Sequence, residues 1–133
     1  MAPSEADPRE WLDRASADLR VAELTLAVPG LPTWAAGFHL QQAAEKALKA
    51  VLVAHGRAAP RTHDVGLLAD EVETLVPALQ GWGERLLALN DFAVAQRYPG
   101  VPHPEMDLER LSDDVRALLE AAATACGSVP PPS

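Results

Sequence analysis

The feature that most constrains the fold is an Ala-rich stretch at residues 33–55, which reads TWAAGFHLQQAAEKALKAVLVAH. Ala, Leu, Gln, Glu and Lys dominate it, all of which favour helix, and neither Gly nor Pro interrupts it after Gly37. Small apolar side chains recur on one face at helical spacing, namely Leu40, Ala43, Ala44, Ala47, Leu48, Val51 and Ala54. Because so shallow a face lets another helix approach closely, the stretch is predicted to be the central helix of the core.

A polar stripe occupies another side of the same helix. His39, Gln42, Lys46 and Lys49 follow one another at spacings of three and four residues, which gathers two cations and an imidazole along one line. Two interpretations are open. The stripe is either a solvated helix face or a site that contacts a nucleotide or RNA phosphate.

Helical patterns also lie before and after this stretch. Apolar residues recur at helical spacing from residue 8 to 27, with Asp7 as the expected cap, and Thr33 is expected to cap the central helix, which ends near His55. Thr62 is expected to cap a short helix, with Asp64 favouring its dipole. A further helix begins at Pro77 and ends by Tyr98, with apolar residues at Leu79, Trp82, Leu86, Leu89 and Ala93; the last helix spans about 104–125.

Length and composition agree with a helical fold. A chain of 133 residues is expected to form a single domain, ordered over about 8–126, with residues 1–7 and 127–133 as frayed tails. Only 5% of the residues are aromatic, whereas Ala and Leu are abundant, which favours helices over a β-sandwich or barrel. The prediction is an all-α, up-and-down four-helix bundle with an extra short helix.

Charge and motif content narrow the function. A net charge of −8 disfavours the sequence-independent coating of DNA, which depends on many Lys and Arg side chains, although a local basic groove remains compatible with it. The sequence has no signal peptide and no apolar window long enough to span a membrane, so a cytoplasmic protein is expected. Metal, P-loop and dinucleotide motifs are also lacking, so we expect no metal site and no cofactor.

Three segments together resemble a known family. The run FHLQQAAEKALKAVL, the triplet Thr62-His63-Asp64 and the later Ala95-Gln96-Arg97-Tyr98-Pro99 are similar, in this order, to segments of the HEPN domain family. The resemblance covers residues 11 to about 119, and it implies a small helical bundle. It also implies a homodimer and a partner nucleotidyltransferase of the MNT type, as in toxin and antitoxin pairs.

The resemblance assigns chemistry to Arg97 and His103. HEPN nucleases cleave RNA without a metal ion by means of an Arg, a spacer of four to six residues and a His. Arg97 and His103, with five residues between them, are similar to this pair. His103 would then transfer a proton, and Arg97 would stabilise the charge that develops on the phosphorus centre. The alternative for Arg97 is a salt bridge to an acidic side chain, and for His103 a plain loop position before the last helix. The spacer Tyr-Pro-Gly-Val-Pro departs from a continuous helix.

Three neighbouring residues complete the candidate site. In a related branch of the family a Tyr near the Arg is modified by the partner nucleotidyltransferase, which makes Tyr98 a candidate. Asn90 and Asp91 precede Arg97 by one to two helical turns, so they could share a groove with it. His63 is expected to take part in helix capping within its triplet.

Two functions from different classes therefore follow from the sequence. The first is a HEPN protein that binds nucleotide or RNA and acts as a metal-independent, toxin-like endoribonuclease. The second is a non-catalytic helical module for dimerisation or protein interaction. The second would use exposed apolar residues, for which the candidates are Trp34, Trp82, Leu52 and Val53.

Overall fold

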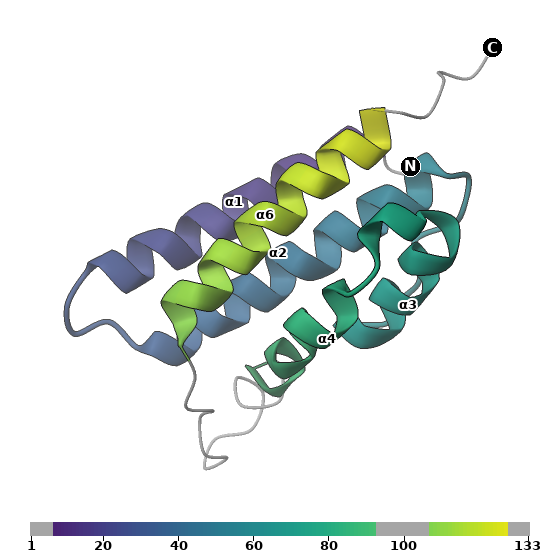
Figure 1. The fold of residues 1–133 in the computed structure, drawn as a ribbon. Helices are drawn as coiled ribbons and strands as arrows, with labels where there is room; N and C mark the ends of the chain where they lie inside the picture. Colours follow the sequence, from purple (N-terminus) through teal and green to yellow (C-terminus); the bar gives the residue numbers. More distant parts are fainter. Residues whose placement is uncertain (1–6, 93–106, 128–133) are drawn as a thin grey trace.

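A computed structural model gives the structure of the protein, and it describes residues 7–92 and 107–127. All regular elements in this part are helical (Figure 1). Three helices are long: α1 (Pro8–Ala27), α2 (Thr33–Ala54) and α6 (Leu108–Gly127). The shorter elements are α3 (Val65–Leu75), η2 (Pro77–Leu79), α4 (Trp82–Leu86) and η3 (Leu87–Leu89). The predicted all-helical class is confirmed.

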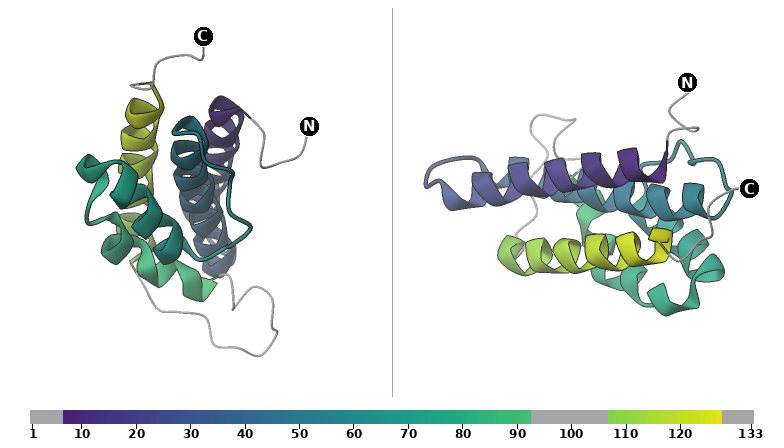
Figure 2. Two further views of the ribbon diagram at one scale, coloured as in Figure 1. Left: turned by 90° about the vertical axis from the view of Figure 1, so that its right-hand side faces the viewer. Right: turned by 90° about the horizontal axis from the view of Figure 1, so that it is seen from above.

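Helix α2 is the centre of the fold, as predicted from its composition. It packs against α1, α3 and α6, and the two views in Figure 2 show these helices arranged around it. Its apolar face is fully buried from Leu40 to Val51, and the alanines on this face bring α1 close. Helix α1 runs antiparallel to both α2 and α6 (Figure 1).

Side-chain caps explain where two of the helices begin. Asp7 caps α1, because its carboxylate accepts a hydrogen bond from the Arg9 amide at 2.8 Å and Pro8 follows at the first helical position. The predicted Asp7 cap is therefore confirmed. At the start of α6 the Asp107 carboxylate accepts from the Arg110 amide at 3.0 Å. Residues 1–6 and 128–133 lie outside the described part of the chain.

The two predicted Thr caps are wrong. Thr33 is already the first residue of α2, and the preceding Pro32, whose ring has no donor or acceptor, occupies the cap position in an extended conformation. Asp64 caps α3, accepting from the Gly66 and Leu67 amides at 2.9 and 3.2 Å. Thr62 lies two residues further back, where its hydroxyl accepts from the Asp64 amide instead. A carboxylate is the stronger acceptor for the positive end of the helix.

The continuous helix predicted to begin at Pro77 is also wrong. The chain instead forms η2, α4 and η3 in succession, with helical residues continuing to Phe92 at the edge of the described segment. Gly81 explains the first break, because its φ of 92° is a left-handed conformation that ends one helical piece before the next begins. The apolar spacing survives the break, since Leu79, Trp82, Leu86 and Leu89 are all buried.

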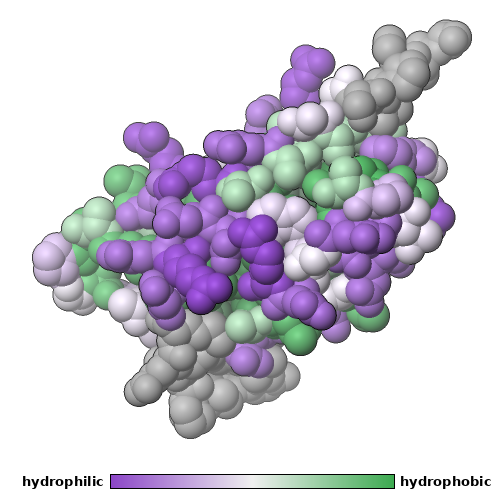
Figure 3. Space-filling model, in the orientation of Figure 1, coloured by the Kyte–Doolittle hydropathy of each residue, from purple (hydrophilic) through white to green (hydrophobic). Residues whose placement is uncertain are grey.

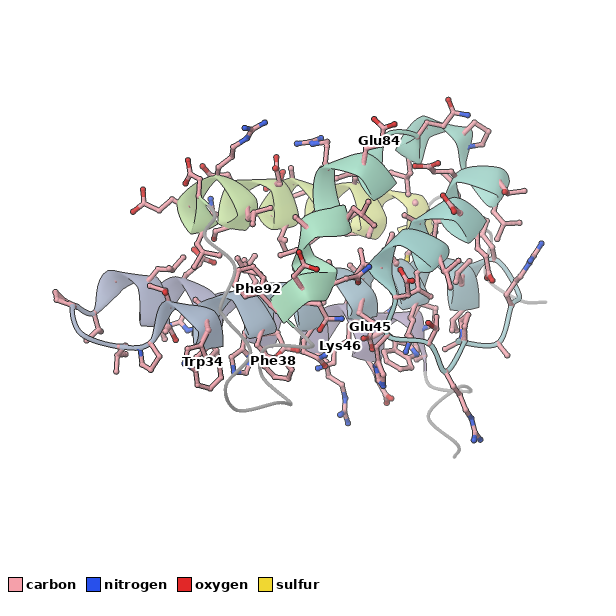
Figure 4. All side chains as sticks on the ribbon, turned by 90° about the horizontal axis from the view of Figure 1, so that it is seen from below. Trp34, Phe38, Glu45, Lys46, Glu84 and Phe92 are labelled. Atoms are coloured by element: carbon pink, nitrogen blue, oxygen red, sulfur yellow. The ribbon has the colours of Figure 1, made fainter. Side chains whose placement is uncertain are left out.

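A close contact joins the end of these short pieces to α2. Phe92 is 1% exposed, and a Cβ added to Gly37 would lie only 2.3 Å from its Cδ1 atom. Only a glycine at position 37 therefore leaves room for the ring against the α2 backbone. Figure 4 shows Phe92 beside α2, with Phe38 near it on the helix and Trp34 closer to the helix start.

The four residues proposed for an exposed docking face do not form one. Leu52 is fully buried and Trp82 is 9% exposed, so both belong to the core, while Trp34 and Val53 are half-buried. The error arose because α2 was assigned one apolar face, whereas α3 covers a second side of it. The middle of the face in Figure 3 is largely hydrophilic, and hydrophobic surface lies both at the end where α1 turns into α2 and in the upper right of the view. Within residues 7–92 and 107–127, no helix is both long and apolar enough to cross a membrane.

Candidate functional site

Three polar side chains are buried on one side of α2. Gln41, Glu45 and Lys49 follow one another at intervals of four residues, and each is 5% exposed or less. Glu45 links the other two, accepting from Gln41 Nε2 at 3.2 Å through Oε1 and from Lys49 Nζ at 3.1 Å through Oε2. The Lys49 ammonium also lies 5.8 Å from the centre of the Trp11 ring on α1. Opposite charges therefore balance within a largely dehydrated environment.

His63, in the connection between α2 and α3, completes what we call the buried polar network: Gln41, Glu45, Lys49 and His63. Its Nδ1 lies 3.0 Å from Glu45 Oε1, and its backbone carbonyl accepts from Gln41 Nε2 at 3.0 Å. The network reaches the surface only at this residue, because the His63 side chain is 55% exposed whereas that of Glu45 is 5% exposed. The predicted capping role passes to its neighbour Asp64.

Two other polar residues of the α2 stripe, His39 and Lys46, contact α1. His39 Nδ1 lies 2.9 Å from one oxygen of Asp18, and the Lys46 ammonium contacts the other. We call these three residues the Asp18 cluster. Gln42 donates to Gln41 at 2.7 Å and so adjoins the buried polar network. The stripe thus divides between the Asp18 cluster and the buried polar network. Both of its lysines have a carboxylate partner, Asp18 for Lys46 and Glu45 for Lys49.

Asn90 ties the end of the short helical pieces to the start of α3. Its Nδ2 donates to Asp64 Oδ1 at 3.0 Å, and its Oδ1 accepts from the Val65 amide at 3.0 Å. Both ends of the amide are engaged, which fixes its orientation. Because Asp64 directly follows His63, this contact places the chain near Asn90 beside the exposed end of the buried polar network. Asp91, the next residue, is exposed.

The remaining predicted site residues, Arg97, Tyr98 and His103, lie outside the described residues, in the 93–106 segment. Asn90, which is described, precedes Arg97 by seven residues in the sequence. Among the described residues, no group of three or more His, Cys, Asp and Glu side chains is arranged to hold a metal ion.

Sequence reasoning missed Gln41, Glu45 and Asp18. The interval of four residues between Glu45 and Lys49 was a signal for an ion pair, since Glu followed by Lys at this spacing is the favourable order in a helix. Nothing in the local sequence indicated that the pair is buried. Burial depends on α1 and the α2–α3 connection, which reach this side of α2 only in the folded chain.

These observations define a class of protein. It is a small domain, all-helical in its described part, in which a central helix carries buried charged residues, and these connect to the surface at His63, next to the Asn90 contact with Asp64. The chain belongs to the HEPN family, because the family model described as HEPN domain matches residues 8–125. Comparisons with curated proteins and with solved structures found no match.

Proposed function

We propose that this HEPN protein binds RNA and cleaves it without a metal ion, in the manner of a toxin-like endoribonuclease. Arg97 stabilises the negative charge on the phosphorus centre of the transition state, and His103 transfers a proton. Tyr98 and Asp91 are proposed to border the same site. The products expected from attack by the 2′-hydroxyl are a 2′,3′-cyclic phosphate and a 5′-hydroxyl end.

The observation that carries the proposal is the Asn90 contact with Asp64. It brings Asn90, which precedes Arg97 by seven residues in the sequence, to Asp64, the residue after His63, where the buried polar network meets solvent. A hydrogen-bonded network of ionised groups is costly to bury unless it is satisfied, and such networks are common where chemistry requires fixed side chains. The family membership of the chain supports the proposed class of activity.

Phosphate binding by the α2 stripe is a second part of the proposal. Lys46 and His39 would contact the RNA backbone in competition with Asp18, which holds both of them in the free protein. Lys49 is buried, so its charge would act on the phosphate indirectly, through the buried polar network. Gln42 would bind the phosphate through its side-chain amide. With a net charge of −8, the protein needs these few cations to offset its repulsion of RNA.

The partners are likewise proposed from the family. We infer a cytoplasmic homodimer in which Arg97 and His103 of the two subunits share one site, with an MNT-type nucleotidyltransferase as the antitoxin. Modification of Tyr98 by that partner would block the site by adding a nucleotide beside Arg97.

Cleavage of end-labelled single-stranded RNA in the presence of EDTA tests the proposal. Wild-type protein is expected to yield a cyclic phosphate end, while R97A and H103A lose activity by about 100-fold or more with an unchanged melting temperature. A matched control is Arg85→Ala, which removes a guanidinium that stacks on Trp82 within α4 and pairs with Asp114 on α6. Activity of R97A and H103A equal to that of the wild type would rule out the proposed roles.

A second candidate function, a helical interaction module, is favoured by one specific surface. Val21, Leu24, Val28 and Leu31 lie along the end of α1 and the turn that follows it, and each is at least 43% exposed. Sedimentation equilibrium of wild-type and L24E protein tests this function. A dimer that L24E dissociates would support an apolar docking face here, whereas identical behaviour of the two proteins would exclude it.

A further inference from the structure

Helix α1 carries apolar side chains on two opposite sides. On the side that packs into the core, Leu19 and Ala22 are buried. On the outer side, Val21 is 43% exposed, Leu24 55% and Val28 49%. A surface helix normally presents polar side chains opposite its core face. The packing of a single copy of the chain therefore does not account for the outer apolar side.

The outer apolar residues are spaced for contact with another helix. Ala17, which is exposed, precedes Val21 by four residues, and Leu24 and Val28 follow after three and four more. Alternating intervals of three and four residues align side chains where two helices pack side by side. We call these four residues the α1 stripe. Leu31, which is 45% exposed in the turn after α1, adds apolar surface at its end.

The α1 stripe lies between the two flanks of α1 that contact the rest of the bundle. On one flank Asp18 binds residues of α2, and on the other Glu23 pairs with Arg116 of α6. The right-hand view of Figure 2 shows α1 along one edge of the helical part. The stripe is therefore open to another molecule.

The charges near the α1 stripe favour a protein partner over a lipid surface. Helices that lie on membranes carry many Lys and Arg residues on their polar side. The outer side of α1 instead continues towards its N-terminus with Glu10 and Asp13, both exposed, and the protein has a net charge of −8. A surface of anionic headgroups would repel such a molecule.

A second copy of α1 that runs in the opposite direction fits the α1 stripe. One register brings all four apolar positions into contact: Ala17 then lies against Val28 of the second copy, and Val21 against Leu24. In both layers the smaller side chain faces the larger one, so the helices keep an even separation. Because the same surface is used by both copies, the contact closes as a two-fold dimer.

Arg20 adds charge complementarity to the antiparallel arrangement. Its side chain is exposed beside the α1 stripe, and this register places it near the last turn of α1 in the second copy. That turn holds no basic residue, and its free carbonyl groups form the negative end of the helix dipole. A parallel pair would instead bring the two Arg20 guanidinium groups together. The charge pattern therefore favours two antiparallel copies.

We propose that the α1 stripe is the contact surface of an antiparallel homodimer, with the two-fold axis between Val21 and Leu24; this inference rests on the second candidate function, the interaction module. A standard interface buries about 800 Å² on each partner, more than one helix face of this length supplies. The dimer is therefore in exchange with the monomer, and its population rises with protein concentration.

Sedimentation equilibrium over a wide range of protein concentration tests the contact. L24E is expected to raise the dimer Kd by about 10-fold or more. Arg20→Glu should raise it by about threefold, less at high salt. Leu67→Glu is the matched control, because it places the same charge at a leucine that is 56% exposed on α3, and it should dimerise as the wild type does. Leu24→Lys, whose charge suits the end of a helix, repeats the test if L24E lowers the melting temperature.

Three results of this experiment would overturn the proposal. The first is a wild-type protein that stays monomeric at every concentration. The second is a dimer that both L24E and Leu24→Lys leave intact. The third is a monomeric wild type that binds phosphatidylcholine vesicles while L24E does not, which would assign the α1 stripe to a lipid surface.

Cysteine cross-linking tests the register. In a C126A background, V21C and L24C proteins are mixed and oxidised with copper phenanthroline, which joins residues whose Cβ atoms lie about 3.5–4.5 Å apart. The mixture should give at least about fivefold more covalent dimer than either variant alone, and L67C should give none. If L24E dissociates a dimer in which the mixture links no better than the single variants, the antiparallel arrangement fails and the interaction function stands. If the wild type and L24E sediment identically, the interaction function itself fails.

Discussion

Replacing Gly37 with Ala is a direct test of how the short helical pieces are fastened to α2. The added Cβ would lie 2.3 to 2.6 Å from three ring carbons of Phe92, whereas carbon atoms in favourable contact are about 3.5–4.0 Å apart. The ring must therefore move by more than about 1 Å. Phe92 is 1% exposed, so there is no free space into which it can move without disturbing its neighbours.

Two opposing terms set the magnitude. Ala in place of Gly within a helix stabilises by about 1 kcal/mol through backbone entropy. Overpacking and the partial loss of Phe92 burial cost about 3 kcal/mol. The net expectation is a destabilisation of about 2 kcal/mol, which lowers the melting temperature by about 7 °C for a domain of this size.

Thermal and urea unfolding followed by circular dichroism measure the effect. Gly83→Ala is the matched control, because a Cβ there meets its nearest neighbour, on Ala69, at an ordinary 3.4 Å and should be neutral or stabilising. In a double-mutant cycle, F92A should cost about 3–5 kcal/mol in the wild type and much less in G37A, where the ring is already displaced. A G37A protein as stable as the wild type would refute the close packing of Phe92 on this glycine.

Three further predictions concern other contacts. Asp64→Ala should cost about 1–2 kcal/mol in urea unfolding, because the helix cap is lost and Asn90 loses its acceptor; a change below about 0.3 kcal/mol would contradict this. Glu45→Ala should cost about 3–5 kcal/mol by leaving the Lys49 ammonium buried without its partner, and E45L combined with K49M should recover most of that loss, a result that additive single effects would exclude. Burial raises the pKa of the Cys126 thiol to about 11, so alkylation by iodoacetamide at pH 8 should be much slower in the folded than in the unfolded protein and should rise towards pH 11. Because only the unfolded thiol loses its proton between about pH 9 and 11, folding stability should fall over that interval, and fast alkylation at pH 8 would refute the assigned burial.

The helices were predictable where the local sequence decides them. The ranges of α1 and α2 agree with the sequence prediction to within a residue. Both are set by local sequence, namely apolar residues at helical spacing and the segment Pro29-Gly30-Leu31-Pro32, which ends α1. The break at Gly81 was not predicted, because the apolar spacing continues across it and periodicity alone does not distinguish one helix from several short ones.

The site was less predictable, since its key contacts join distant residues. The spacing that placed Lys46 and Lys49 on one stripe was correct, but Asp18 and Glu45 divide them between two clusters. Asn90 was chosen for its place before Arg97, whereas its observed contacts are with Asp64 and Val65, more than 20 residues earlier. Partners at such separations are fixed by tertiary structure, and a single sequence does not specify them.

The turn between α1 and α2 has a consequence for how the chain folds. These two helices share the most extensive contact of the described chain and are joined by residues 28–32 alone, so bringing them together requires closing only a short loop. Their pairing is therefore expected to be an early folding event, with α6 docking onto the preformed hairpin afterwards. Asp18 binds His39 and Lys46, which lie 21 and 28 residues later in the chain. These contacts would select the correct register of α1 against α2 at that stage, before the other helices have packed.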